Sequence, residues 1–302
     1  MMKSTVLEPK PSIQTDCPSP AVMHEALLSE WPAELSGRFQ RDRHGATQLV
    51  RLSHRGPLRI QRLFQTGPWA ECYLLHPPGG LVTGDSLAIE MMLAEKACVL
   101  VTTPAAGKVY GARHTAGWQQ TEVRLQMADE TGLAWLPQDT ICFDRARVRQ
   151  SFDISVAPSA WHVGWEQVTF GRRASSAPFQ SGQFSQSVCI HRAGIALYRD
   201  RISVTPDVLA SLAGLAGLTV MAVLWIVLPE GHSVIPAIEI ARQSTPSSGL
   251  WTGATAVTAE LGIVRVLGDD ALQVRQYLES LWTDWTPLCV GQSVHPPRIW
   301  RT

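Results

Sequence analysis

Two side chains able to hold a cation flank one sharply specified turn. The run at residues 76–85 reads His76-Pro77-Pro78-Gly79-Gly80-Leu81-Val82-Thr83-Gly84-Asp85. Proline fixes φ and glycine permits positive φ, so Pro-Pro-Gly-Gly predicts one rigid backbone path rather than a generic surface loop. An imidazole and a carboxylate suit a borderline divalent cation such as nickel, which does not need thiolate ligands. The turn is therefore the first candidate for metal chemistry.

Three further carboxylates stand in motif-rich stretches: Asp139, Asp144 and Glu166. Glu166 follows a tryptophan and is expected to be partly buried, where a carboxylate must be paired. Two interpretations stay open for it, a salt bridge to an arginine or a functional role. None of the nine histidines has another His or a Cys at tight-ligand spacing, so no tightly bound cofactor is expected. The candidates for a path of weak, transient nickel coordination are His76, Asp85, Asp139, Asp144 and Glu166.

The enzyme alternative is a metal-dependent hydrolase that uses His76, Asp85 and Glu166. Against it, the chain contains no GxSxG, HExxH, Walker A or GxGxxG sequence. The glycines of the turn could cradle a phosphate, but no Lys-Ser/Thr pair follows them. Lys108 could bind an anion, although an exposed lysine on a β-hairpin is the favoured interpretation. A nickel storage protein is a third alternative, which the lack of histidine-rich tracts disfavours.

Composition limits the partners and the compartment. Lys+Arg and Asp+Glu number 26 each among 302 residues, and a net charge of zero disfavours nucleic acid or an anionic membrane as partner. Six cysteines are scattered without a CxxC pair, which is typical of thiols in a reducing cytoplasm. Residues 1–25 are polar, rich in Pro and Ser and without an apolar signal-peptide core, and predict a disordered tail. Residues 26–302 are predicted to form a single domain.

Most of the chain has the pattern of short strands separated by Gly, Pro or Asp. Residues 147–156 alternate between polar and apolar, which indicates a strand with one buried face, whereas the apolar run 98–101 indicates burial on both faces. The predicted strands are 72–75, 86–93, 97–102, 122–127, 132–136, 148–156 and 188–190. The pattern predicts a mainly β single domain, and periodicity alone does not separate a parallel β-helix, a sandwich and a barrel.

About two helices are predicted in the C-terminal half. Residues 206–215 follow Thr205, a suitable N-cap, and begin with proline. Residues 269–285 repeat apolar positions mostly three or four apart. The stretch 208–228 contains no charged residue, as a membrane span requires. Its two glycines and its β-branched second half favour a short helix followed by a buried strand instead.

These motifs occur together in the order of one known family. The run 76–85 resembles, nearly letter for letter, the signature of the urease accessory protein D family, UreD or UreH. The similarity extends from Trp31 to the end of the chain and includes Gly56-Pro57-Leu58-Arg59, Thr102-Thr103-Pro104, the run 135–140, Glu166 and Pro297-Arg298-Ile299-Trp300. The signature positions are Pro77, Pro78, Gly79, Gly80, Gly84, Trp135, Pro137, Gly171 and Arg172.

The resemblance implies a non-catalytic urease maturation factor. Members of the family fold as an elongated, largely β, helix-like stack of strands with two helices, so the resemblance implies an elongated β-helix-like or stacked-sheet single domain. They bind the urease apoprotein and a helical accessory protein, UreF, which recruits the GTPase UreG, and the assembly delivers nickel to the urease active site. An internal channel is the proposed nickel route. We therefore expect a cytoplasmic scaffold with nickel as transient cargo and with neither nucleic acid nor membrane as partner.

Two departures from the family pattern stand out. Thr83 occupies the place of a second glycine in the turn, and Ser176-Ala177 replaces a typical Gly-Glu pair. The missing glutamate removes one acidic group from any metal path. It leaves the scaffold interpretation intact but weakens a strict nickel-carrier interpretation.

Overall fold

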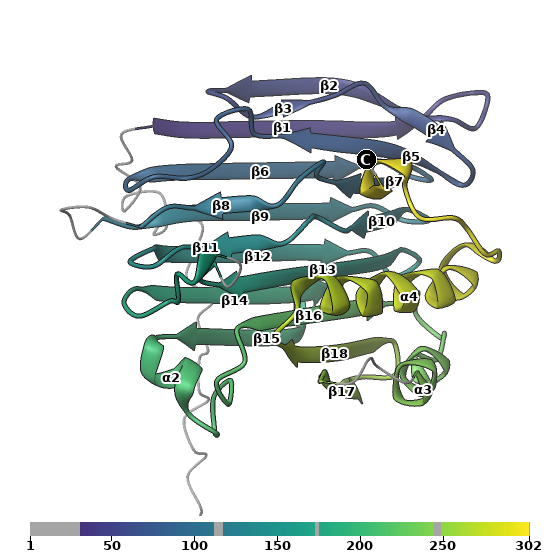
Figure 1. Cartoon of the computed structure of the whole chain (residues 1–302). Coiled ribbons are helices and arrows are strands. Elements are labelled where there is room, and N and C mark those ends of the chain that lie inside the picture. Colours follow the sequence, from purple (N-terminus) through teal and green to yellow (C-terminus); the bar gives the residue numbers. More distant parts are fainter. Residues whose placement is uncertain (1–30, 112–116, 173–174, 245–248, 302) are drawn as a thin grey trace, which may run out of the picture.

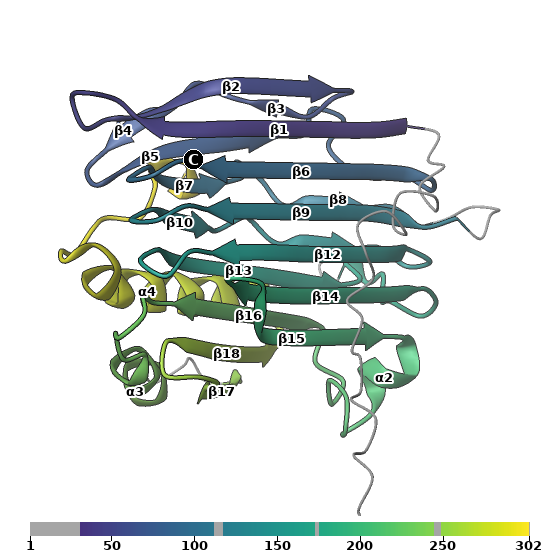
Figure 2. The same cartoon turned by 180° about the vertical axis from the view of Figure 1, so that it is seen from behind.

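The computed structural model describes residues 31–111, 117–172, 175–244 and 249–301, so the predicted tail at 1–25 lies outside the described residues. Two β-sheets lie face to face along the molecule, and helices α3 (Ile235–Gln243) and α4 (Ala271–Val290) lie at the outer side of one of them (Figures 1 and 2). The predicted mainly β fold is confirmed.

The seven-stranded sheet has a parallel centre and an antiparallel strand at each edge. Its spatial order is β15-β14-β12-β9-β6-β1-β2, in which β1-β2 and β14-β15 are the antiparallel pairs. The strands are β1 (Trp31–Arg41), β2 (Thr47–Arg55), β6 (Asp85–Leu93), β9 (Gln119–Met127), β12 (Arg147–Val156), β14 (Gln183–Arg192) and β15 (Ile195–Val204).

The eleven-stranded sheet follows the path β17-β18-β16-β13-β10-β7-β5-β3, with β4 pairing β5, and with β11 joining β13 to β8. Its central strands β5, β7, β10 and β13 are parallel neighbours. The strands are β3 (Arg59–Ile60), β4 (Phe64–Thr66), β5 (Trp69–Leu75), β7 (Cys98–Thr102), β8 (Gly107–Val109), β10 (Gly132–Trp135), β11 (Thr140–Cys142), β13 (Trp161–Phe170), β16 (Val220–Val227), β17 (Trp251–Ala256) and β18 (Leu261–Gly268).

The chain passes from one sheet to the other with nearly every strand. From β5 to β14 it visits β6, β7, β9, β10, β12 and β13 in turn, adding one strand to each sheet per coil. Parallel neighbours need a long crossover, and here the strand of the opposite sheet provides it. This path is the β-helix-like stack that the family resemblance implies.

Burial explains why some strands alternate between polar and apolar residues while others are apolar throughout. Along β12, every second residue is buried between the sheets, and the alternate residues face solvent. β13 is buried along almost its whole length, because α4 covers its outer face while the seven-stranded sheet covers its inner face. β7 is likewise buried at every position but the first, as its apolar sequence predicts.

Among the described residues, two of the three α-helices match the predictions. α2 (Pro206–Ala210) begins after Thr205, whose hydroxyl accepts the N–H of Val208, but it ends earlier than predicted. α4 begins after Asp270, whose carboxylate accepts two backbone N–H groups, and extends past the predicted end to Val290. α3 was not predicted, because its short sequence IPAIEIARQ lacks a side-chain cap. Its buried side chains pack on β17 and β18.

The uncharged stretch 208–228 has the predicted organisation. α2 leads into a turn, and β16 then runs between β13 and β18 with all of its residues buried. Among the described residues, no helix combines the length and apolar character that crossing a membrane demands.

The C-terminal segment folds back over the outer face of the eleven-stranded sheet. A short 3-10 helix, η2 (Arg298–Arg301), carries Trp300, whose indole N–H donates to Oγ1 of Thr102 at 2.8 Å. The guanidinium of Arg275, from α4, lies 4.5 Å from the Trp300 ring and 4.7 Å from the Trp165 ring. Arg275 also donates to the carbonyl oxygen of Pro137 at 2.6 Å. Arg275 therefore links the C-terminal segment to the segment that follows β10, on the outer side of the sheet.

Candidate functional site

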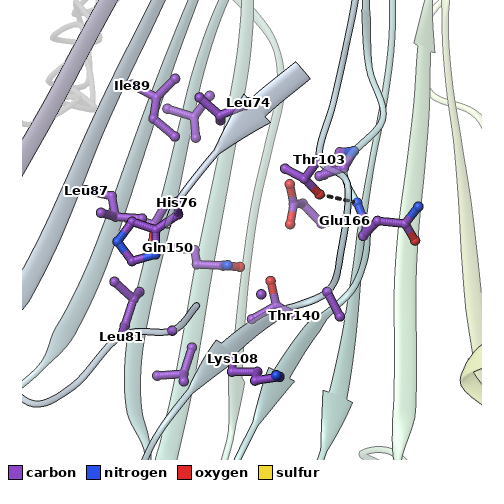
Figure 3. Close-up of a pocket in the computed structure, with 18 of the residues that line it drawn as sticks. Leu74, His76, Leu81, Leu87, Ile89, Thr103, Lys108, Thr140, Gln150 and Glu166 are labelled. Carbon is purple, nitrogen blue, oxygen red and sulfur yellow. Dashed lines mark hydrogen bonds between the residues drawn. The ribbon is translucent and has the colours of Figure 1, made fainter. Parts of the chain in front are cut away.

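A cavity of about 220 Å³ lies between the two sheets (Figure 3). Inward residues of β6, β9 and β12 form one wall, and residues of β5, β10 and β13 contribute to the other. His76 and Glu166 lie on opposite sides of the space in Figure 3. The polar residues of the lining are His76, Thr103, Lys108, Thr121, Gln138, Thr140, Gln150 and Glu166.

The Pro-Pro-Gly-Gly run forms the predicted tight turn. The N–H of Gly79 donates to the carbonyl oxygen of His76 at 3.0 Å, which closes the turn around the two prolines. Gly79 has φ of +76°, a conformation that residues with a Cβ rarely adopt. The turn thereby fixes the direction in which His76 leaves β5.

Gly80 and Leu81 attach the turn to β8. Leu81 donates its N–H to the carbonyl oxygen of Lys108 at 2.8 Å and accepts the N–H of Tyr110 at 2.9 Å. A Cβ on Gly80 would lie 2.5 Å from the Tyr110 ring and 2.8 Å from the Lys108 oxygen, so only glycine fits. β8 itself pairs in parallel with β11, so the hairpin expected at Lys108 is wrong. Lys108 is exposed, as predicted, and lines the cavity.

His76 and Asp85 have different structural roles. His76 is half-buried at the cavity, and burial lowers its pKa, although the nearby Asp85 charge acts in the opposite direction. Oδ2 of Asp85 accepts the N–H of Val82 at 2.8 Å, so the carboxylate caps the second half of the turn. Asp85 is thus held by the backbone, and His76 is the flanking residue that lines the cavity.

Glu166 is a buried acid held by a tryptophan. The indole N–H of Trp135 donates to Oε1 of Glu166 at 3.0 Å. Burial raises the pKa of Glu166 to about 8, and the hydrogen bond opposes this shift. No arginine in the described part of the chain pairs with Glu166, so the salt-bridge interpretation is wrong. Its neighbour Trp165 points the other way, where its N–H donates to the Pro137 oxygen at 2.8 Å.

Asp139 and Asp144 are outside the cavity lining. Asp139 accepts the Thr169 hydroxyl at 3.2 Å, and burial raises its pKa while Arg275 opposes the shift. Oδ1 of Asp144 accepts the N–H of Ser181 at 2.7 Å and that of Gln180 at 2.9 Å. Of the five candidates for a nickel path, the structure therefore brings only His76 and Glu166 into the cavity.

The remaining signature residues organise the backbone around the cavity. Gly84 and Gly171 have φ of +91° and +82°, and a Cβ on Gly171 would lie 2.8 Å from the Ala177 oxygen. Arg172 exchanges backbone hydrogen bonds with Ala177 and stacks on Phe143 at 4.6 Å. These residues have structural roles, as does the alanine that replaces the usual glutamate.

Gln150 is a cavity residue that the sequence interpretation missed. It is buried on the inner face of β12, and Oε1 accepts the amide N–H of Gln186 at 3.2 Å. The sequence contains the signal, because Gln150 is the polar exception among the inward positions Val148, Phe152 and Ile154. Thr103 and Thr140 were missed because they lie in connections whose path only the fold defines.

The cavity contains few groups that could hold a metal ion. One imidazole and one buried carboxylate share a small interior space, and the described residues contain no group of three or more His, Cys, Asp or Glu placed to hold a metal ion. Asp85 is not in the lining, so the trio of the hydrolase alternative does not assemble there, and that alternative is unsupported. The molecule is a stacked-sheet β protein with a small interior cavity, lined mainly by apolar residues and by a few polar side chains.

Comparison with known proteins places this chain in a family. Residues 32–301 match the family model described as UreD urease accessory protein. The chain is 39% identical over 285 residues to the urease accessory protein UreD of Chromohalobacter salexigens, covering 90% of this chain and 89% of the relative. It is 38% identical over 284 residues to that of Marinobacter nauticus, covering 90% and 93%. The chain belongs to the UreD family of urease accessory proteins, as the turn at 76–85 predicts.

Proposed function

We propose that the chain is a non-catalytic scaffold of urease maturation that passes nickel through its interior cavity. The observation that supports this most directly is that His76 and Glu166 both line one cavity between the sheets, in a chain of the UreD family. Nickel is cargo in this account, held weakly and released, with no tightly bound cofactor.

The chemistry of the lining suits transient coordination. Burial lowers the pKa of His76, so its imidazole is neutral at physiological pH and offers a nitrogen lone pair. The raised pKa of Glu166 keeps its carboxyl group protonated near neutral pH, and an arriving cation would displace that proton and gain a carboxylate oxygen. Thr140 and Gln150 also line the cavity and would offer hydroxyl and amide oxygens as further weak ligands. Few strong donors favour release over storage.

The partners we propose are those of the family. The scaffold would bind the urease apoprotein and a UreF-like helical accessory protein, and through that protein a UreG-like GTPase. The chain itself lacks a Walker A sequence, so the GTPase would supply nucleotide hydrolysis. We place this assembly in the cytoplasm, with neither nucleic acid nor membrane as partner.

The Ala177 substitution does not conflict with this function. Ala177 contributes its backbone to the pairing with Arg172, and position 177 is not in the cavity lining. A side-chain carboxylate there is not needed for the His76 and Glu166 pair. We therefore expect this chain to be active.

Co-expression tests the proposed function. Urease subunits and the other accessory proteins would be produced with and without this chain, and nickel per urease active site would be measured by elemental analysis. We expect nickel loading to depend on the chain. Full loading in its absence would contradict the proposal, and metal-dependent turnover by the isolated chain would favour the hydrolase alternative instead.

A further inference from the structure

The outer face of the seven-stranded sheet is a broad surface that none of the described helices covers. α3 and α4 lie against the other sheet, and α2 lies beyond β15 at the end of the stack (Figure 2). The strands β6, β9, β12 and β14 run parallel and in register, so their outward side chains form continuous rows. One such row runs Ser36, Glu90, Arg124, Asp153, Cys189 and Arg199.

This face carries an excess of positive charge in a chain that is neutral as a whole. The outward basic residues are Arg38, Arg51, Arg55, Arg124, Arg147, Arg149, Arg199 and Arg201. The outward acidic residues are Glu34, Glu90, Glu122 and Asp153. Arginines therefore outnumber carboxylates by eight to four here, while Lys+Arg equals Asp+Glu in the whole sequence.

Half of these basic residues lie on β12 and β15, at one side of the face. Arg149, Arg199 and Arg201 lie on β12 and β15, are exposed, and have no carboxylate in salt-bridge contact within the described part of the chain. The Arg147 and Arg149 guanidinium groups lie 4.7 and 4.5 Å from the ring centre of Trp118. Arginine and tryptophan are the residue types that most often dominate binding energy at protein interfaces.

The size of the face matches a protein interface. Seven strands spaced about 4.8 Å apart, each about 30 Å long, offer on the order of 900 Å². A standard protein–protein interface buries about 800 Å² of each partner. The outward residues are mostly polar or charged, which is typical of an interface that forms and separates rather than of a permanent one.

We infer that this face docks an acidic surface of the urease apoprotein. The inference rests on the proposed function and adds to it the surface that binds the urease apoprotein. Among the proposed partners, urease is the one that must leave once it has received nickel. An electrostatic contact through exposed arginines associates fast and separates readily. The apolar contacts of α3, α4 and the C-terminal segment lie on the opposite side of the molecule.

A charge-reversal variant tests the inference. Arg149→Glu, Arg199→Glu and Arg201→Glu would be combined, and affinity for purified nickel-free urease would be measured at low and high salt. The control combines Arg62→Glu, Arg242→Glu and Arg298→Glu, which lie off this face and change the net charge equally. We expect the face variant to lose about tenfold or more in affinity, the control to keep it, and salt to weaken wild-type binding. Circular dichroism would verify that both variants are folded.

The outcomes separate this inference from the proposed function. If the wild type binds nickel-free urease and the face variant binds it with the same affinity, the inference is overturned and the proposed function is unaffected. A face variant that loses the helical accessory protein but keeps urease would also overturn it, because the face would then belong to that partner. A wild-type chain that does not bind nickel-free urease at all would overturn both.

Discussion

Trp135 donates its indole N–H to Oε1 of Glu166 across two neighbouring strands of one sheet, at a distance of 3.0 Å. The contact provides one hydrogen bond to a carboxyl group that is otherwise held among apolar walls. Burial outweighs this bond, so the folded chain keeps Glu166 protonated near neutral pH.

Glu166→Gln is expected to flatten the pH dependence of stability. The pKa of Glu166 is about 8 in the folded chain and 4.5 as its ordinary value, so the folded state holds this proton more tightly. The contribution of this proton to the free energy of unfolding is fully present below pH 4.5 and is lost as pH rises through 8. The loss is on the order of a few kcal/mol. Glutamine stays neutral, so the variant should exceed the wild type in stability at pH 8.5. Urea denaturation at pH 5 and 8.5 measures this, and parallel profiles would contradict it.

Gly80→Ala is expected to strain the turn. Its Cβ would lie 2.8 Å from a backbone oxygen of Lys108, which cannot move aside as a flexible side chain can. We expect a loss of about 2 kcal/mol in the free energy of unfolding, within the range for overpacking. Gly253→Ala on β17 is the control, because a Cβ there meets no atom within 4 Å. Equal stability of the two variants would show that the turn tolerates a side chain.

The sequence predicted this turn well, because its restraints are local. Two prolines and two glycines limit the backbone between residues 77 and 80 whatever surrounds them. The cap at Asp85 is also a local contact. The turn's attachment to Lys108 and Tyr110 is non-local, and only the fold shows it.

His162→Phe is expected to destabilise the protein at neutral pH. The buried imidazole accepts the Trp225 N–H at 2.8 Å, and its other nitrogen lies 2.8 Å from the Leu133 oxygen. Phenylalanine would leave both partners unpaired, at a cost of about 2–5 kcal/mol in the free energy of unfolding. Chemical denaturation at pH 7.5 measures the cost, and a loss below about 1 kcal/mol would contradict this reading of the contact.

The same histidine should make the wild type sensitive to acid. Burial lowers the pKa of His162 to about 4, from an ordinary 6.5. Its stabilisation is present above pH 6.5 and is lost as pH falls through 4, since the unfolded state binds the proton first. The stability difference between wild type and His162→Phe should therefore shrink from pH 7 to pH 4. A constant difference over this range would rule out the buried neutral imidazole.

Trp300 is expected to act as the anchor of the C-terminal segment. Trp300→Phe keeps a ring beside Arg275 but loses the hydrogen bond to Thr102, and should cost about 1 kcal/mol. Trp300→Ala also loses the stacking and should cost about 2–4 kcal/mol. Thermal and urea denaturation rank the two variants. Equal effects would mean that the ring contacts contribute nothing.

Parts of the candidate site depended on contacts that no local pattern encodes. Asp144 looks like a metal ligand in the sequence, yet it binds two N–H groups of residues 180 and 181, which are far away in the chain. For Glu166 the sequence left open an arginine salt bridge or a functional role, and its hydrogen-bond partner is the indole of Trp135 on β10. Strand alternation did predict which residues face inward, and Gln150 follows that rule.

The central claim is that nickel reaches urease through the cavity between the sheets, and a blocking side chain tests it most directly. Thr140→Phe would place a ring in the space that His76 and Glu166 share, whereas Thr255→Phe on the exposed β17 leaves that space open. Both folded variants would replace the wild type in co-expression, and nickel per urease active site would be measured. The account predicts that Thr140→Phe lowers nickel to the level found without the chain and that Thr255→Phe loads urease fully. Full loading with Thr140→Phe would contradict it.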